Sequence, residues 1–196
     1  MTPLERTLKR SGDIFGASVS LVCFSPIFLI IYLIQKFGVR GPVIYSQERI
    51  GKNGKPFRIY KFRTMVPGSE NEGPVLASPT DDRVTRVGKF LRNHHIDELP
   101  QLWNVLKGDM SFVGYRPERQ FYIDQIMALN PDYALLYCSR PGVTSLAAIH
   151  NGYTDTMDKM LKRLDMDLEY LRNRTLLLDV KIILSTFMSL LKDIVP

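Results

Sequence analysis

An uncharged stretch near the N-terminus restricts the folds open to this chain more than any other feature. Residues 14–34 read IFGASVSLVCFSPIFLIIYLI and contain no Asp, Glu, Lys or Arg. As a straight helix rising about 1.5 Å per residue, this stretch just crosses a hydrocarbon core of roughly 30 Å. A secretory signal peptide is rejected, because the stretch is long for one and no small-residue cleavage site follows. We therefore expect this segment to enter a membrane.

The dipeptide Ser25-Pro26 interrupts the middle of this stretch. Proline lacks a backbone donor and clashes with the preceding turn, so the helix should break there. The positive-inside rule keeps both flanks in the cytoplasm, because both are basic: Arg6, Lys9, Arg10, Lys36 and Arg40. Residues 1–40 are thus predicted to form a re-entrant helix-break-helix that enters and leaves by the same face. The alternative is a kinked span, which membranes tolerate.

The remaining residues, 41–196, have the composition of one globular domain. In the whole chain of 196 residues, 45% are hydrophobic and 23% are charged, which excludes a disordered protein. The net charge of +6 predicts an anionic partner, such as nucleic acid, a membrane surface or a phosphorylated substrate. The two cysteines, Cys23 and Cys138, lie in an apolar and a polar region, so we expect no disulfide between them. No Cys and His residues have the spacing of a zinc site.

A short β-hairpin is predicted after the apolar segment. Residues 43–47 and 57–62 have strand character and flank Asn53-Gly54, a strong turn signal. Lys61 and Arg63 fall on one face of the second strand, because side chains alternate along a strand. Such a cation pair can grip a phosphate or form a solvated edge, and the residues alone favour the solvated edge.

Helical patterns occupy most of the rest of the domain. Residues 83–92 form an amphipathic basic pattern that fits either an anionic membrane surface or a helix packed on a soluble core. Further helices are predicted at 118–129, 157–172 and 176–191. The expected fold class is α+β: the membrane helix-break-helix, a small hairpin, and several amphipathic interfacial helices around one compact cytoplasmic domain.

The segment 94–117 carries the densest chemistry. Asp97 and Glu98 open a predicted short helix that ends at Gly108. Its spacing rests on Leu99, Leu102, Trp103 and Leu106. Asp97 is either an ordinary N-cap or a reactive group. Trp103 is read as a core residue or an interfacial anchor.

The acid pair is suited to chemistry on phosphorus. A carboxylate at a helix N-terminus is expected to stay ionised, and an ionised aspartate can form an aspartyl-phosphate. The phosphate charge must be neutralised, and Asp97 with Glu98 can hold Mg²⁺, which prefers oxygen ligands. Arg116 and Arg140, each followed by proline, are the expected phosphate clamps.

Several ordered motifs together resemble one family, the bacterial sugar transferases or monotopic phosphoglycosyl transferases, in their small core-only form. The resemblance covers nearly the whole chain. It rests on Ser25-Pro26, residues 61–65 (KFRTM), 82–88 (DRVTRVG), 97–111 (DELPQLWNVLKGDMS), 140–144 (RPGVT) and 164–170 (LDMDLEY).

The resemblance implies transfer of a sugar-1-phosphate from a UDP-sugar to polyprenyl (undecaprenyl) phosphate, with release of UMP. Asp97 matches the nucleophile of a ping-pong route through a covalent aspartyl-phosphosugar intermediate, and Glu98 matches its partner, with Mg²⁺ required. The implied substrate-binding residues are Lys61 and Arg63, which match the basic strand motif, and Arg116 and Arg140, which match phosphate-side positions. The implied location is the cytoplasmic face of the bacterial inner membrane, in contact with the lipid bilayer.

Two departures from the family pattern affect substrate identity more than reaction type. Tyr115 stands where the family usually has proline in Gly-Pro-Arg-Pro, and residues 145–148 read SLAA where many members have GWAQ. The transferred sugar, the glycan pathway and a homodimeric state stay open. The competing hypothesis is a non-catalytic basic membrane adaptor that binds anionic lipid. Nucleic-acid binding is not expected, because no such motif occurs.

Overall fold

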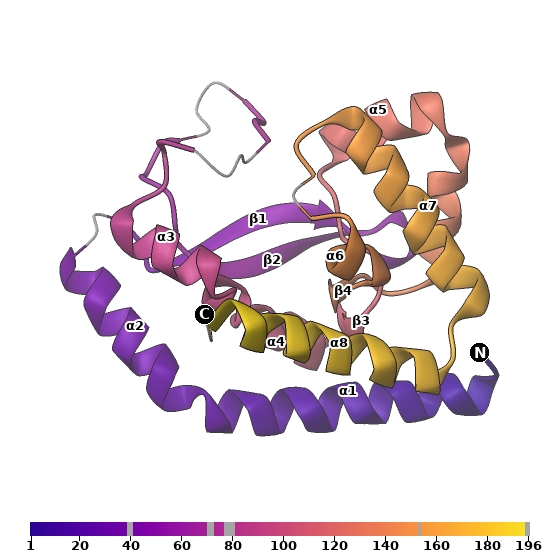
Figure 1. Cartoon of the computed structure of the whole chain (residues 1–196), viewed down its shortest axis with the longest axis horizontal. Helices are drawn as coiled ribbons and strands as arrows, with labels where there is room; N and C mark the ends of the chain where they lie inside the picture. The colour runs from indigo at the N-terminus through magenta and orange to yellow at the C-terminus, as the bar shows by residue number, and fades with distance from the viewer. Residues whose placement is uncertain (39–40, 70–72, 77–80, 153, 195–196) are drawn as a thin grey trace.

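The N-terminal segment forms two helices that meet at an angle. The computed structural model describes residues 1–38, 41–69, 73–76, 81–152 and 154–194. Helix α1 (Pro3–Cys23) and helix α2 (Ser25–Gly38) are bent by 57° where they meet, which confirms a helix broken at Ser25-Pro26. Figure 1 shows the pair bordering two sides of the molecule. Arg40, one of the predicted basic flanks, lies outside the described residues.

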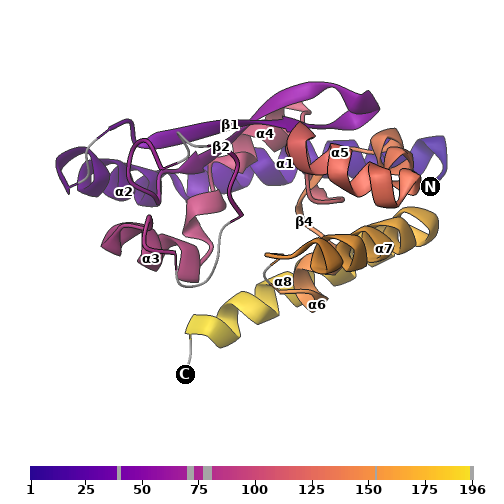
Figure 2. The same cartoon turned by 90° about the horizontal axis from the view of Figure 1, so that it is seen from above.

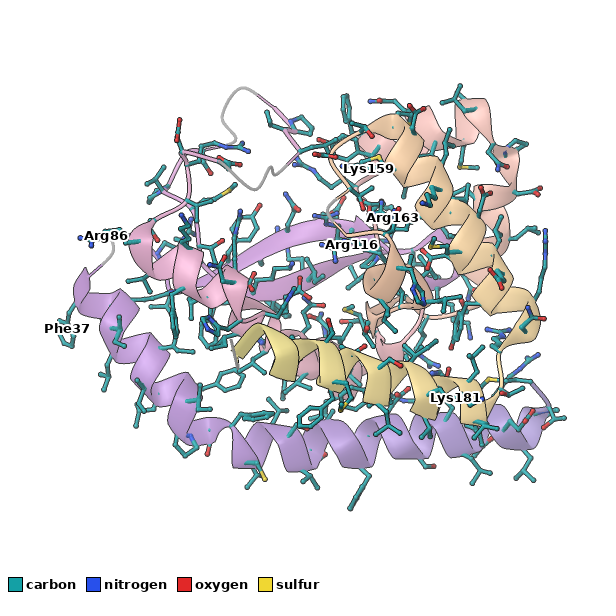
Figure 3. All side chains as sticks on the ribbon, in the orientation of Figure 1. Phe37, Arg86, Arg116, Lys159, Arg163 and Lys181 are labelled. Atoms are coloured by element: carbon teal, nitrogen blue, oxygen red, sulfur yellow. The ribbon has the colours of Figure 1, made fainter. Side chains whose placement is uncertain are left out.

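No helix in the described part of the chain is both long and apolar enough to cross a bilayer alone, whereas α1 and α2 together meet that requirement. Large apolar side chains on both helices are exposed, and Phe37 points away from the body of the protein at the far end of α2 (Figure 3). The pair is therefore bent as predicted, and its re-entry into a membrane stays a prediction.

The predicted hairpin is present. Strand β1 (Ile44–Ile50) pairs antiparallel with strand β2 (Pro56–Phe62), from Ile44 opposite Phe62 to Ile50 opposite Pro56. The connection contains the 3₁₀ turn η1 (Lys52–Gly54), in which Asn53 and Gly54 take positive φ values of 60° and 69°. These two residue types adopt that conformation most readily, which is why the turn was predictable.

The basic pattern at 83–92 becomes helix α3 (Arg86–Asn93), which begins three residues later than predicted. Thr85 caps it by accepting a hydrogen bond from the Gly88 backbone N–H at 2.9 Å. The apolar face packs inward: Leu91 joins a core cluster with α2 and the hairpin, and only Phe90 among its large apolar side chains is exposed. This favours a helix packed on the core.

The acid pair lies on a 3₁₀ turn ahead of its helix. Turn η2 (Ile96–Glu98) leads into helix α4 (Gln101–Lys107), which ends as predicted at Gly108 with φ 95°. The N-cap interpretation of Asp97 is wrong, because His95 occupies the cap position in the left-handed conformation and Asp97 lies inside the turn. Trp103 is 51% exposed, which excludes the core interpretation.

A second, parallel strand pair escaped prediction. Strand β3 (Ser111–Val113) pairs with strand β4 (Gly142–Thr144). A Cβ on Gly114 would lie 2.4 Å from the Arg140 carbonyl oxygen, and one on Gly142 would lie 2.1 Å from the Gly114 nitrogen. The two backbones can therefore cross only with glycine at both positions.

The remaining helical elements build the main core and a smaller second cluster. They are α5 (Gln120–Leu129), the 3₁₀ segment η3 (Pro131–Cys138), α6 (Leu146–His150), α7 (Met157–Asn173) and α8 (Leu176–Ile194). Leu164 and Leu168 of α7 are buried against Ile123 and Leu136, which confirms the predicted apolar face. Figure 2 shows the hairpin and the α7–α8 pair on opposite sides of the molecule. Both cysteines are free, as expected.

These elements give an α+β fold made mostly of helices, with one small antiparallel hairpin. The proposed boundary at residue 40 lies outside the described residues, so the division into 1–40 and 41–196 stays a prediction.

Candidate active site

Asp97 and Glu98 are brought against the cation of Lys61. Asp97 is only 7% exposed, and the Glu98 carboxylate forms an ion pair with the Lys61 ammonium, in which its Oε1 accepts the hydrogen bond. The Arg116 guanidinium approaches the same Oε1, at 4.0 Å from its Nη2. Lys61 is thus paired with a half-buried carboxylate, and its interpretation as part of a solvated edge is wrong.

The two neighbouring acids respond in opposite ways to this environment. Burial raises the pKa of Asp97, against the lowering effect of Lys61. Burial also opposes ionisation of Glu98, but Lys61 and Arg116 outweigh it and lower the pKa of Glu98 to about 2. Loss of water therefore makes Asp97 harder to ionise than a free aspartate, and its ionised state stays a prediction.

Asn104 explains why Lys61 and the acid pair meet. This residue of α4 is fully buried; its Oδ1 accepts a hydrogen bond from the Tyr60 N–H at 3.1 Å, and its Nδ2 donates to the Arg58 carbonyl at 2.7 Å. The amide thereby satisfies the free backbone groups of the β2 edge, much as a third strand would. Helix α4 is fastened to β2 one residue from Lys61, which brings Glu98 within reach.

Buried groups hold the backbone around Arg116 in place. The Tyr115 carbonyl accepts a hydrogen bond from the Gly142 N–H at 2.9 Å, and the Arg116 N–H donates to Asp167 Oδ2 at 3.4 Å. Tyr115, where the family resemblance leads us to expect proline, is 1% exposed. Backbone pairing and burial therefore restrain this turn without a proline at residue 115.

Asp167, the acceptor for the Arg116 N–H, is a buried carboxyl group. It is 2% exposed, and its Oδ1 has no hydrogen-bond partner. Burial raises the pKa of Asp167 to about 7, despite the opposing effects of Arg163 and the Arg116 N–H. A buried carboxyl group with an unsatisfied oxygen is costly, so its presence behind Arg116 points to a role in holding that segment.

An ion-pair network continues from this point into the core. Glu118 accepts hydrogen bonds from Arg163 on α7 and from Arg49 on β1, the latter at 3.1 Å. Figure 3 shows Arg163 and Arg116 close together between the hairpin and α7. The short segment from Arg116 to Glu118 is thus fixed both to the hairpin, through Arg49, and to α7, through Arg163.

Sequence reasoning missed Arg92, Glu118 and Asp167. Arg92 of α3 donates from Nε to Thr64 Oγ1 at 2.9 Å and lowers the pKa of Asp97 electrostatically. A signal for Asp167 was available, because it is a charged residue beside Leu164 and Leu168 on the apolar face of its helix.

The structure does not bring two of the predicted clamps to the acid pair. Arg63 donates from Nε to the Pro42 carbonyl at 2.7 Å, and its guanidinium lies 5.7 Å from the centroid of the Tyr45 ring. Arg140 donates from Nε to the Gly108 carbonyl at 2.8 Å, at the end of α4 opposite to Glu98. The side chains gathered at one place are those of Asp97, Glu98, Lys61 and Arg116.

The chemistry of this group fits a magnesium ion held jointly with a substrate. Among the described residues, no set of three or more His, Cys, Asp or Glu side chains could hold a metal ion. Mg²⁺ commonly binds one or two carboxylates and completes its shell with water and substrate phosphates. Asp97 and Glu98 provide those carboxylates, and the low pKa of Glu98 keeps one of them ionised.

Comparisons with known proteins identify the family of this chain. The family model described as bacterial sugar transferase matches residues 4–193. A UDP-N-acetylgalactosamine-undecaprenyl-phosphate N-acetylgalactosaminephosphotransferase of Aeromonas hydrophila is 41% identical over 190 residues, which cover 97% of this chain and 45% of that protein. A UDP-glucose:undecaprenyl-phosphate glucose-1-phosphate transferase of Klebsiella pneumoniae is 43% identical, over 93% of this chain and 40% of that protein.

One relative has nearly the same length as this chain. The exopolysaccharide production protein PSS of Rhizobium leguminosarum bv. phaseoli is 36% identical, over 95% of this chain and 96% of that protein. By contrast, the chain spans less than half the length of the Aeromonas and Klebsiella relatives. The family model covers almost every residue described above, including both helices of the bent pair and the acid pair. The chain therefore belongs to the bacterial sugar transferase family.

Proposed function

We propose that this protein is a phosphoglycosyl transferase that moves a sugar-1-phosphate from a UDP-sugar to undecaprenyl phosphate and releases UMP. The observation that carries the proposal is the buried Asp97 beside an ionised Glu98, with Lys61 and Arg116 converging on that glutamate. The names of the Aeromonas and Klebsiella relatives, which act on UDP-sugars and undecaprenyl phosphate, support it.

In the first half of the reaction, an Asp97 carboxylate oxygen attacks the phosphorus that bears the sugar. The new oxygen–phosphorus bond forms as the bond to UMP breaks, which leaves the sugar-phosphate on the aspartate. In the second half, an oxygen of undecaprenyl phosphate attacks the same phosphorus and the Asp97 carboxylate departs. The product is an undecaprenyl diphosphate sugar, and the enzyme is regenerated.

The residues around Asp97 divide the other tasks. Lys61 and Arg116 are placed to neutralise phosphate oxygens once the diphosphate competes with Glu98 for them. Lys61 and Arg92 both favour the ionised form of Asp97, which the attack requires. Asp97 and Glu98 would hold Mg²⁺, which would add further neutralisation of the diphosphate charge. Arg63 and Arg140 stay candidates for contacts with more distant parts of the substrates.

The proposed setting is the cytoplasmic face of the bacterial inner membrane. The bent pair α1–α2 exposes apolar side chains on both arms, which supports burial in lipid as a re-entrant hairpin. A lipid phosphate would then reach the acid pair at the membrane surface.

Replacing Asp97 by asparagine tests the nucleophile, because asparagine keeps the shape but lacks the charged, nucleophilic carboxylate. We expect Asp97→Asn to reduce UMP release at least 10³-fold and to abolish the sugar-phosphate adduct in intact-protein mass spectra. Asp132→Asn, an exposed change on η3, is the matched control. Full turnover by Asp97→Asn would refute the assignment. An absence of Mg²⁺-dependent UMP release by the wild type with a panel of UDP-sugars would favour the basic lipid-binding adaptor.

A further inference from the structure

The two arms of the bent N-terminal pair hold the two elements that carry the active site. Helix α1 contacts α4 at its C-terminal end. The Arg10 guanidinium donates from Nη1 to the Val105 carbonyl at 2.7 Å and from Nη2 to the Leu106 carbonyl at 2.9 Å. Carbonyls in the last turn of a helix have no partner within that helix, and a cation is favourable there. Arg10 therefore fixes the end of α4.

Other contacts prevent α1 from sliding. Asp13 Oδ1 accepts a hydrogen bond from the Phe112 N–H at 3.1 Å, and Lys9 donates to the Val113 carbonyl at 3.0 Å. Ala17 is fully buried in a cluster with residues of α4 and β2. These polar contacts lie on the inward face of the same helix that exposes apolar side chains on its other face.

Helix α2 holds the other wall of the site. Gln35 is 2% exposed, and its Nε2 donates to the Arg63 carbonyl at 2.9 Å. Ile31, one turn earlier, packs in a cluster with Phe62. Lys61 directly precedes Phe62, so the contacts of Gln35 and Ile31 with this end of β2 determine the position of the lysine.

We infer that Arg10 and Gln35 are positioning residues for the acid pair. Arg10 sets the place of α4, Gln35 sets the place of the β2 end, and the 57° bend between α1 and α2 fixes the separation between Glu98 and Lys61. This inference rests on the proposed function. Arg10 contacts the C-terminal end of α4, opposite to the end that carries the acid pair. Displacement of a reacting group by about 1 Å can cost 10²-fold in rate.

The test separates position from folding by single-turnover kinetics. The wild type and the variants Arg10→Gln and Gln35→Met are mixed with UDP-glucose or UDP-N-acetylgalactosamine, whichever the wild type accepts. The adduct on Asp97 is followed by mass spectrometry. A misfolded fraction lowers only the amplitude, whereas a displaced acid pair lowers the rate constant. We expect at least a tenfold lower rate constant in both variants, partial recovery in Arg10→Lys, and no change in Arg6→Gln, an exposed change on the same helix.

Hydrogen–deuterium exchange supplies a readout that does not need activity. We expect Arg10→Gln to speed exchange of the amides in residues 96–107 and Gln35→Met to speed exchange in residues 57–63. Unchanged rate constants with a lower amplitude, or unchanged exchange in both segments, would overturn the inference. If the wild type forms no adduct, the proposed function fails, and the exchange rates alone decide whether the two arms hold the site.

Discussion

Lys61 is the residue on which the charge state of the whole site depends. It lowers the pKa of both Asp97 and Glu98, while burial raises both. Within the described part of the chain, this lysine forms the close ion pair with Glu98, whereas the Arg116 guanidinium stays at 4.0 Å. Its removal should therefore make both acids harder to ionise.

We accordingly expect Lys61→Met to lower UMP release at pH 7 at least tenfold and to shift the acid limb of the pH–activity profile to higher pH. The sign follows because a raised pKa requires a higher pH for ionisation. Lys55→Met, an exposed change in the turn of the same hairpin, is the control. A profile for Lys61→Met that superimposes on that of the wild type after scaling would contradict this account.

Asp167 makes stability depend on pH in the opposite sense to an ordinary ion-paired acid. Its pKa is raised from 3.8 to about 7 in the folded state, so the folded protein binds more protons than the unfolded chain between these values. Stability should fall as pH rises from about 4 to about 7. At about 1.4 kcal/mol per pKa unit, the loss amounts to a few kcal/mol.

The variant Asp167→Asn should lose this dependence while it keeps an oxygen for the Arg116 N–H. We expect guanidinium unfolding in detergent micelles to show a falling midpoint for the wild type between pH 5 and pH 8, and a flatter profile for Asp167→Asn. The exposed Asp165→Asn, two residues earlier, should behave as the wild type does. Parallel profiles for Asp167→Asn and the wild type would show that the carboxyl group titrates normally.

At the scale of elements, helix α3 and the chain beyond β2 approach each other most closely at Gly88. A Cβ on Gly88 would lie 2.0 Å from the Thr64 carbonyl oxygen, which is backbone and cannot move aside cheaply. The Thr64 hydroxyl oxygen also accepts a hydrogen bond from Arg92 Nε. The close approach of Gly88 to Thr64 therefore sets the position of Arg92 relative to Asp97. The helix and the chain beyond β2 must therefore separate if any side chain is introduced.

Gly88→Ala and Gly12→Ala form a matched pair of helix substitutions. We expect Gly88→Ala to destabilise the fold by about 2 kcal/mol or more, through overpacking. Gly12 lies within α1, where an added Cβ would have no atom within 4 Å, and it should gain about 0.5–1 kcal/mol as alanine. Thermal melts of the two variants check both signs. A neutral Gly88→Ala would mean that α3 does not pack closely on Thr64.

Elements with local signals were predictable from the sequence, and those set by distant contacts were not. Asn53-Gly54 specifies its turn through its own backbone preferences, and Leu164 with Leu168 specifies the buried face of α7. By contrast, β3 and β4 have three residues each, too few for a periodic pattern. Their pairing depends on glycines far apart in the chain, Gly114 and Gly142.

The candidate site divides in the same way. The residues themselves singled out Asp97, Glu98 and Arg116, and the resemblance added Lys61; the structure brings these four together. Arg63 and Arg140, which were predicted with them, lie apart. The residues alone had favoured a solvated Lys61, because nothing near it in the chain reveals that Asn104 fastens α4 to its strand. The raised pKa of Asp97 was equally hidden, since burial is a property of the whole fold.

At the scale of the whole molecule, the two native cysteines can report the membrane arrangement. Cys23 ends α1 at the bend, and Cys138 ends η3; both are exposed in the isolated chain. If the bend is the deepest point of a re-entrant hairpin, lipid shields Cys23 and leaves Cys138 in water. The two thiols should then differ in their reaction with a polar reagent.

We expect a membrane-impermeant maleimide to label Cys138 but not Cys23 in inside-out vesicles, and to label both after detergent solubilisation. Variants Cys23→Ser and Cys138→Ser assign the signals. Cysteines introduced at Thr2 and Lys36 should both react from the cytoplasmic side. A residue 2 that reacts only from the periplasmic side would establish a span in place of the hairpin.

The ion pair between Lys9 and Asp179 has a consequence for the order in which the protein is made. Its partners are separated by 170 residues and joined at 2.6 Å. At synthesis rates of about 5–20 residues per second, the lysine waits roughly 10–30 s for its aspartate to leave the ribosome. During that interval, the nascent α1 lacks Asp179 as a partner for Lys9 and, at first, also lacks the α4 carbonyls that Arg10 binds. The first helix to emerge is thus among the last to be locked in place.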